Sequence, residues 1–465
     1  MIKATFKDTG PIKSAELELG DLTIIAGQNN TGKTYLVYTL YGFLKYINEP
    51  SHWYSLQEIG GDNSISKQLN IFARQLSDSG VLSIPATQFK HLVKQYIQEL
   101  SRFFSKELIH NVYSTSKQEF ADAQFNLEMD VNDITDETFI PGLKSLPIDI
   151  SVSFKGKRVV FEQEMQAEVP SPEDFIPTEL YVCLGRFISL KSPSVFNLSA
   201  ERFGISLFYK ELDFTKNRLV EELQKLSDGT KHFNPFEFII KGSSRYAQPI
   251  KDNIDFTRDL ARIQTQKSVL TSDDNSIREM MEGYYKADSS DIRFISRRRK
   301  NNRFDIPLHL ASSSARGLSD MYFYLKHVAS PGELLIIDEP ESHLSPTNQI
   351  LMARLLAFCV NAGLKVLITT HSDYLIKEIN NLVMLDNNFE GKEEFLARHK
   401  NEYTEHDRLS PDAIKAYTCE AGTLKACRID SAGIDMPVFD DAIDKINRTS
   451  NELALLTMPH GMQND

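Results

Sequence analysis

The 465-residue sequence is poor in the features that define several large protein classes. It holds four cysteines and no CxxC pair, which argues against a disulfide scaffold or a cysteine zinc site and favours a reducing compartment. No apolar run approaches the roughly 18 residues that span a bilayer, and the N-terminus resembles neither a signal peptide nor a transit peptide. We therefore expect a soluble, cytoplasmic protein that makes no membrane contact. The cysteines are Cys183, Cys359, Cys419 and Cys427, of which Cys359 is expected to be a buried thiol and the last two to face each other across a hairpin.

Positive charge is also scarce, with 52 Lys and Arg against 64 Asp and Glu and a formal net charge of -12. This balance argues against a protein whose whole surface is built to hold nucleic acid, but it leaves a local basic patch open. The run RRRKNNR, Arg297 to Arg303, is such a patch, although runs of this kind are more often solvated hairpin turns. The sequence shows no sustained heptad repeat over 50–290, so a long coiled-coil arm is not expected there.

The regular patterns lie towards the two ends of the chain. In the N-terminal part they predict a hairpin over 2–7 and 13–18, a buried strand over 21–27 and a helix over 35–47. In the C-terminal part they predict a hairpin from 291, a helix over 318–329, a strand leading to Asp338, a helix over 346–361 and a strand over 364–373. Strands that alternate with helices indicate a largely parallel sheet with crossover helices.

The patterns divide the chain into four parts. We expect an N-terminal part of a core domain over 1–50, a mostly helical insertion with β-hairpins over 51–290 that rejoins the core near 195–212, and a C-terminal part of the core over 291–385. Within the insertion, 88–109 and 203–226 read as helices, 125–131 as a strand and 148–165 as a hairpin. The tail, 386–465, reads as a further hairpin and a helix.

The segment GQNNTGKT, Gly27 to Thr34, fits the phosphate-binding pattern GxxxxGK[ST] and lies between the predicted strand and helix, as that motif requires. The glycines let the backbone curl until its N–H groups point at phosphate oxygens, and the helix N-terminus adds its dipole. Lys33 supplies a charge to the β- and γ-phosphates, and the Thr34 hydroxyl is a ligand for Mg²⁺. The residues expected to bind ATP are Gly27, Asn29, Asn30, Thr31, Gly32, Lys33 and Thr34.

Two acids end the buried strand of LLIIDEPESHL. Ligands of open α/β sheets bind at the carboxyl ends of the strands, and buried carboxylates are costly without a cation partner. We expect Asp338 to hold Mg²⁺ and Glu339 to polarise the attacking water. The alternative is that the strand simply ends in solvent and that the two acids have no functional role.

His371 follows the next predicted strand, in VLITTHSDYL. A lone histidine is usually structural. At the end of a strand next to that of Asp338, however, it could contact the γ-phosphate and orient the water. We therefore place His371 beside Glu339 as a catalytic residue.

These three motifs resemble those of the ATP-binding-cassette ATPases, in the branch around RecF, SMC and the OLD (overcoming-lysogenisation-defect) ATPases. The run FKDTGPIKSAELELGDLTIIAGQNNTGKTYLVYTLYGFL, with LSAERFGISLFYKEL and LHLASSSARGLSDMYFYLKH, looks like the AAA-type ATPase subunits of bacterial anti-phage defence systems such as Septu, PARIS and abortive-infection operons. The resemblance covers roughly 1–47, 195–212 and 290–385. It implies an α/β, ABC-type P-loop NTPase core with a mixed sheet, interrupted by a large, mainly helical insertion with some β structure.

The resemblance also gives a role to LASSSARGLSD. In the family a serine–glycine signature at a helix N-terminus closes on the γ-phosphate bound by the other protomer, and Ser312, Ser313 and Ser314 stand at that position. The usual glycine is missing, because Ser314 or Ala315 occupies its place. The alternative is an ordinary serine cap for the following helix. If the signature reading is right, the protein is a homodimer, or a higher homo-oligomer, with composite ATP sites.

Some candidate residues stay open at this stage. Arg202, in the AERFG segment with Glu201, is a candidate nucleotide sensor or partner contact, and a structural ion pair is an equal alternative. Gln57 is a weak candidate for the Mg²⁺-linked glutamine of these ATPases.

The nuclease features of the OLD family are absent from the sequence. The residues after His371 contain no DxD following a buried strand and no cluster of histidines, so no built-in nuclease is expected. By resemblance, the chain is an ATP- and Mg²⁺-dependent sensor or scaffold that controls a separate effector, a nuclease, in response to a phage-derived trigger. The alternatives are a RecF- or SMC-like DNA-repair ATPase and a nucleotide-locked scaffold that rarely turns over ATP.

Overall fold

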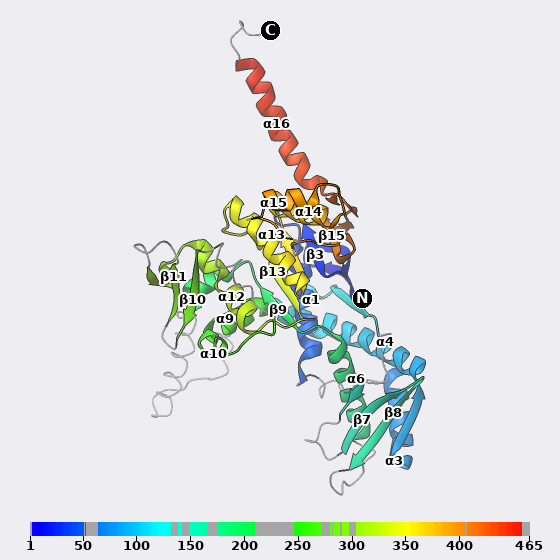
Figure 1. Cartoon of the computed structure of the whole chain (residues 1–465). Helices are drawn as coiled ribbons and strands as arrows, with labels where there is room; N and C mark the ends of the chain where they lie inside the picture. The colour runs from blue at the N-terminus through cyan, green and yellow to red at the C-terminus, as the bar shows by residue number, and fades with distance from the viewer. Residues whose placement is uncertain are drawn as a thin grey trace, which may run out of the picture.

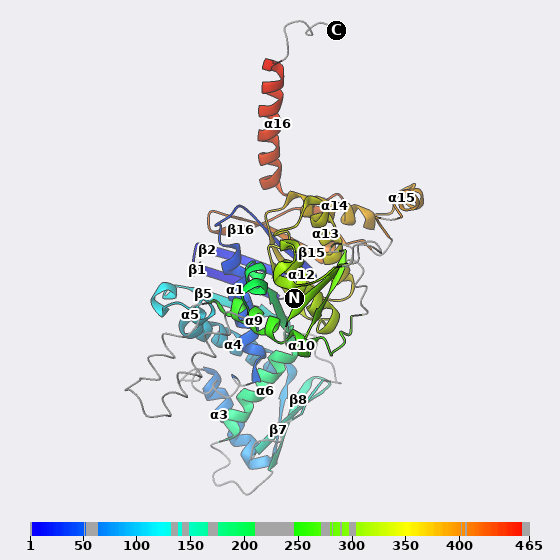
Figure 2. The ribbon, with the colours of Figure 1, turned by 90° about the vertical axis from the view of Figure 1, so that its left-hand side faces the viewer.

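The computed structural model contains a large central body with smaller lobes and one projecting helix (Figures 1 and 2). It describes residues 2–50, 52, 64–131, 138–141, 148–165, 175–209, 246–270, 280, 282–288, 291–296, 304–400, 402–404 and 407–457. Among these, no helix is both long enough and apolar enough to cross a bilayer.

The central body is built on a nine-stranded mixed sheet. Its order is β5 (Gln124–Met129), β1 (Ile2–Thr9), β2 (Ile12–Leu19), β16 (Thr423–Ala426), β15 (Ile414–Glu420), β3 (Leu22–Ala26), β14 (Lys365–Thr370), β13 (Leu334–Asp338) and β9 (Val195–Leu198). From β15 to β9 all neighbouring strands are parallel, whereas β5, β1 and β2 pair antiparallel. The carboxyl ends of β3, β14 and β13 therefore meet at one edge of the sheet.

The central strands are apolar on both sides because helices cover both faces of the sheet. In β13, Leu334 and Ile336 belong to one buried cluster, and Leu335 and Ile337 belong to the other. The first cluster contains α1 (Lys33–Asn48), α4 (Ala86–Phe103) and α6 (Ile176–Lys191). The second contains α12 (Ser313–His327), α13 (Pro346–Asn361) and α14 (Asp373–Asp386). The core is thus a three-layer α/β/α arrangement.

Three smaller sheets accompany the central one, and the smallest is the pair of β17 (Ile429–Asp430) and β18 (Gly433–Ile434). The lower lobe of Figure 1 holds the four-stranded sheet of β4 (Val81–Pro85), β8 (Arg158–Met165), β7 (Ile148–Lys155) and β6 (Phe139–Ile140), packed with α3 (Ser64–Ser79), α4 and α6. A three-stranded sheet of β10 (Gly283–Ala287), β11 (Ile292–Ser296) and β12 (Asp305–Pro307) lies beside α9 (Gln248–Arg258), α10 (Leu260–Ile263) and α12.

Most elements expected from the sequence are present. The hairpins β1–β2, β7–β8, β11–β12 and β15–β16 form, and α13 has the predicted bounds. The helix expected over 88–109 is α4 followed by a π-helical turn (Phe104–Leu108) and the short α5 (Ile109–Val112). The helix expected over 203–226 is described only as far as Tyr209, and Gln57 and the basic run 297–303 lie outside the described residues.

The sheet draws strands from all four expected parts of the chain. β5 and β9 come from within 51–290, and β15 and β16 from the tail, where they lie between β2 and β3. The tail hairpin is therefore part of the same sheet as the phosphate-binding strand. The short helix α15 (Lys392–Arg398) precedes the tail hairpin. The last described helix, α16 (Pro437–Thr457), comes after it.

The expected pairing of Cys419 with Cys427 is wrong. Cys419 lies opposite Leu424, and the backbone N–H of Cys427 donates to the carbonyl of Ala416. The hairpin turn is tight, with Ala421 and Gly422 both at positive φ, and this register separates the two thiols. Cys359 is fully buried, as predicted.

Candidate nucleotide-binding site

The phosphate-binding loop joins β3 to α1, and its shape is set by close packing against residues of β2 and β15. Gly32 precedes α1 with φ 99°, and a Cβ on it would come within 2.6 Å of the Ile12 side chain. A Cβ on Gly27 would lie 2.6 Å from the carbonyl oxygen of Cys419. Both glycines are thus required by the approach of neighbouring strands as well as by the turn. Asn30 has φ 63°, a region that asparagine tolerates.

Lys33 is a buried cation that curls back over this loop. Its ammonium Nζ donates to the carbonyl oxygens of Gly27 at 2.9 Å and Gln28 at 2.8 Å, and the residue is only 6% exposed. Thr31 also closes the loop by donating its hydroxyl to Gln28 O. Asn29 and Asn30 are exposed at its tip. A cation whose bonds, among the described residues, go to neutral carbonyls beside a helix N-terminus is well suited to receive phosphate oxygens.

Asp338 lies next to the loop, at the carboxyl end of β13. Its Oδ2 accepts a hydrogen bond from the Thr34 hydroxyl at 3.0 Å, and its Oδ1 accepts one from the hydroxyl of Thr369. Burial raises the pKa of Asp338 to about 6, the two hydroxyls oppose this, and the charge of Glu339 adds to it. The end of β13 is therefore joined directly to the phosphate-binding loop.

Thr34 and Asp338 fit a magnesium site by their chemistry. They offer a hydroxyl and a carboxylate oxygen 3.0 Å apart, and Mg²⁺ is usually bound by one or two such protein oxygens together with substrate phosphates and water. The buried carboxylate also carries the desolvation penalty that a cation would relieve. Among the described residues, no group of three or more His, Cys, Asp or Glu side chains forms a metal site by itself.

Glu339 has an unusual backbone. Its φ of 52° is in the left-handed region, which costs a residue with a Cβ about 1–2 kcal/mol. Its N–H donates to Thr369 on β14, and its side-chain Oε2 accepts from the Ser342 hydroxyl at 2.9 Å. The turned backbone re-aims this carboxylate at the end of the strand, where its side chain stays 29% exposed.

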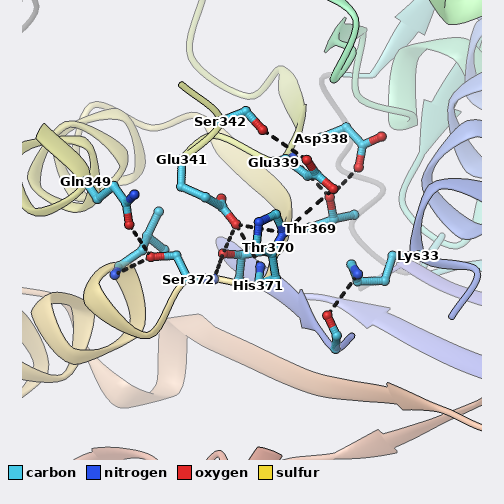
Figure 3. A network of polar contacts seen from close by, with 12 residues as sticks. Lys33, Asp338, Glu339, Glu341, Ser342, Gln349, Thr369, Thr370, His371 and Ser372 are labelled. Carbon is cyan, nitrogen blue, oxygen red and sulfur yellow. Dashed lines mark hydrogen bonds and ion pairs between the residues drawn. The ribbon is translucent and has the colours of Figure 1, made fainter. Parts of the chain in front are cut away.

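His371 stands at the end of β14, directly beside these acids (Figure 3). Its ring Nδ1 lies 3.7 Å from Glu339 Oε1 and 3.4 Å from Glu341 Oε1. The ring is 42% exposed, so it lines an open part of the site. The two predicted catalytic residues, Glu339 and His371, are therefore neighbours.

Glu341 was not singled out from the sequence. Its side chain is buried, and its Oε1 accepts from the backbone N–H of His371 at 2.7 Å and from the Thr370 hydroxyl at 2.8 Å. The other oxygen, Oε2, is buried and has no hydrogen-bond partner among the described residues. Ser372 continues this network by capping α14 and donating to Gln349 (Figure 3). The signal in the sequence that could have indicated Glu341 is its place directly after the motif Asp-Glu-Pro at the end of β13, the strand next to the one that ends in TTHS.

Arg202 is buried, and within the described part of the chain its partners are backbone carbonyls rather than a carboxylate. The buried guanidinium donates to the backbone carbonyls of Asp338 at 2.8 Å and Glu339 at 2.7 Å. It also donates to Ser199 O and Gly317 O, both at 3.1 Å. Burial lowers the pKa of Arg202, and the surrounding acids oppose that shift. Arg202 therefore fixes the backbone of both acids and ties it to α12.

The serines of the expected signature begin α12, five residues before the predicted start. Ser312 caps the helix, because its hydroxyl accepts from the Ala315 N–H at 3.2 Å. The Ser314 hydroxyl donates to the His343 carbonyl at 2.7 Å, just beyond the two acids. Within the described part of the chain, no hydrogen bond joins Ser312, Ser313 or Ser314 to the phosphate-binding loop. The capping role is thus present, and the role in phosphate binding stays a prediction.

The family profile of the AAA ATPase domain matches residues 10–376, which include the loop, both acids and His371. The chain belongs to this family. Membership in this family indicates that the chain is an ATP-binding ATPase. The predicted α/β P-loop NTPase fold with a mixed sheet is confirmed.

Solved structures and curated proteins add little to this assignment. The chain is similar to the SMC head domain from Thermotoga maritima, with 10% identity, 92% of this chain and 98% of that chain covered and a TM-score of 0.29. It is similar to an SMC head domain from Pyrococcus furiosus with an extended coiled coil, with 11% identity, 97% and 100% covered and a TM-score of 0.31. It is also similar to the recombination mediator protein RecF, with 11% identity, 91% of this chain and 97% of that chain covered and a TM-score of 0.31. A comparison with curated proteins gives no match.

Proposed function

We propose that this AAA ATPase binds Mg²⁺ and ATP between two copies of the chain and hydrolyses ATP as a switch for a separate effector protein. The observation that carries the proposal is the contact of Thr34 with Asp338, which brings the phosphate-binding loop to the acids and His371 at one edge of the sheet. Lys33 binds the β- and γ-phosphates, for which it leaves the loop carbonyls. Thr34 and Asp338 hold Mg²⁺, which when bound neutralises phosphate charge.

Hydrolysis in this site relies on positioning and on charge stabilisation. Glu339 accepts a proton from the attacking water, and its left-handed backbone, held by Arg202 and Thr369, sets the direction of the carboxylate. His371 donates a hydrogen bond to the γ-phosphate from the exposed side of its ring. Glu341 accepts the backbone N–H of His371 and so fixes the backbone that carries the ring.

The second copy enters the proposal through α12. Within the described residues, the hydroxyls of Ser312 and Ser314 bond within α12 and to His343, so the Ser313 hydroxyl and the helix dipole are left for a phosphate bound by another chain. Since each site then needs two chains, the nucleotide state is coupled to assembly. By the resemblance of its motifs, the switch responds to a phage-derived trigger and controls a nuclease effector.

The deciding experiment uses Glu339→Gln. This variant keeps the shape of the side chain but cannot accept the proton, so we expect ATP binding to persist, turnover to fall by about 100-fold or more, and a closed dimer to accumulate with ATP. Light scattering and phosphate release measure the two effects. A variant that hydrolyses ATP normally and stays monomeric with ATP rejects the assignment.

The RecF-like alternative is tested with the unaltered chain. Turnover is measured with and without duplex DNA at two salt concentrations. Strong stimulation by DNA with steep salt dependence supports a DNA-repair ATPase, whereas turnover indifferent to DNA supports the switch.

A further inference from the structure

The last described helix, α16, projects from the body with no layer over it. Figures 1 and 2, which differ by a quarter turn, both show it standing away from the central sheet. Every described side chain on it, from Asp444 to Thr457, is exposed. These include four large apolar side chains, Ile446 (65% exposed), Leu453 (56%), Leu455 (68%) and Leu456 (76%). Helices in proteins owe most of their stability to packing of an apolar face, and the apolar side chains described on α16 lie exposed.

Three of the four large apolar side chains follow a seven-residue repeat, with Thr449 at the position between them and Leu455 outside it. Ile446, Thr449, Leu453 and Leu456 are spaced by three, four and three residues, which are the a and d positions of a heptad. The same spacing extends back in the sequence to positions 439 and 442, which are Phe and Ala. This spacing places the four positions on one face of the helix, as in the seam between two paired helices.

The charges beside this stripe fit a second copy of α16 that runs in the opposite direction. When two copies overlap over their full length, position 446 of each copy lies opposite position 449 of the other. In that register Lys445 of each copy flanks Glu452 of the other, so two ion pairs border the apolar seam.

A parallel pair is disfavoured by the same residues. Lys445 would then face Ser450 and Glu452 would face Thr457, so neither charge would find its opposite. Parallel copies would also align the two helix dipoles.

We propose that α16 is a self-association surface that pairs antiparallel with α16 of a second copy. The pair places the two bodies at opposite ends of a helix about 30 Å long, so it cannot be the contact that closes an ATP site. It is a second kind of contact between copies, independent of nucleotide. Together, two such contacts link ATP-bound pairs into a higher homo-oligomer.

The test uses the full chain without nucleotide. Sedimentation over a range of concentrations is expected to show a concentration-dependent dimer. Leu453→Glu places a charge in the seam twice per dimer and should weaken association by roughly 100-fold. The matched control is Ala454→Glu, which adds the same charge on the neighbouring, outward-facing position and should leave association unchanged.

Charge reversal then identifies the partner and the direction. Lys445→Glu should weaken the dimer, and the double variant Lys445→Glu/Glu452→Lys should restore it, because each chain then supplies both altered charges. A chain that stays monomeric without nucleotide, equal effects of the 453 and 454 variants, or a double variant as weak as the single one would each overturn the proposal. Nucleotide binding by Leu453→Glu should equal that of the unaltered chain, which separates this test from that of the ATP site.

Discussion

Glu341 holds the backbone of His371: its Oε1 accepts the N–H of His371 at 2.7 Å and lies 3.4 Å from the ring Nδ1. The same oxygen accepts the Thr370 hydroxyl, and the carboxylate is buried. The loop after β13 is thereby tied to the end of β14 at the point where the histidine enters the site. The direction of the His371 ring depends on an acid that has no exposed surface of its own to offer a substrate.

We expect Glu341→Gln to lower kcat while leaving the KM for ATP nearly unchanged. Glutamine keeps one acceptor for the backbone N–H and the Thr370 hydroxyl, but it removes the negative charge beside the ring. A misdirected ring should reduce kcat by about 10- to 100-fold. The measurement is steady-state phosphate release over a range of ATP concentrations.

Two further variants distinguish positioning from folding. Glu341→Ala leaves the Thr370 hydroxyl and the His371 N–H buried without their acceptor, so it should lower the free energy of unfolding by about 1–3 kcal/mol. Glu394→Gln, on exposed α15, should change neither quantity. If Glu341→Gln turned over ATP like the unaltered chain, the carboxylate would have no positioning role.

The residues of the site differ in how far the sequence could predict them. Lys33, Thr34 and Asp338 could be predicted because each belongs to a motif that is recognisable within about ten residues. The motifs are a glycine loop before a helix and a pair of acids after an apolar strand. The distant partners of Arg202 could not be predicted, since they are backbone carbonyls from two segments far away in the sequence, at Gly317 and at Asp338. Glu341 gave little signal because its role appears only when β13 and β14 lie side by side.

The same limit applies to the fold. Periodicity predicted the hairpin β15–β16, but it could not show that this hairpin enters the sheet between β2 and β3, because non-local strand pairing leaves no local pattern. The start of α12 at Ser313 was missed since the apolar pattern begins later than the Ser312 cap. The cysteine register failed because it depends on the turn at Ala421 and Gly422.

Ser313→Arg tests whether α12 completes the site of another chain. Ser313 is the first residue of α12, so a large cation there should block closure on a partner but leave the chain's own loop intact. We expect ATP binding by the isolated chain to persist and turnover to be lost. Loss of ATP binding itself would show that the stretch belongs to the same-chain pocket or is structural.

A mixing experiment sharpens this result. Lys33→Ala should abolish turnover by itself because it removes the phosphate-binding charge. A mixture of Lys33→Ala and Ser313→Arg chains can form one site with an intact loop and an intact α12, so it should recover roughly a quarter of the original turnover if pairs form at random. No recovery would argue against a composite site.

Asp320 is a buried acid on α12 whose titration should be visible in stability. Burial raises its pKa to about 7, against the opposing effects of hydrogen bonds from Thr257 and Ser319 and of the Arg202 charge. Because the folded pKa lies above the unfolded value of 3.8, unfolding releases a proton between these two values, and stability falls as the pH rises from about 4 to about 7. Below that window the group contributes nothing, and above it the full penalty applies.

Asp320→Asn replaces the acid by a neutral side chain of the same shape and should remove this penalty. We expect its free energy of unfolding to exceed that of the unaltered chain by about 2–4 kcal/mol at pH 8, with the difference fading towards pH 4. Chemical denaturation at a series of pH values measures it, and exposed Asp412→Asn serves as the control. If Asp320→Asn were instead less stable at pH 8, Asp320 would be ionised in the fold as the counter-charge of Arg202, and the two side chains would have to be treated as one buried pair.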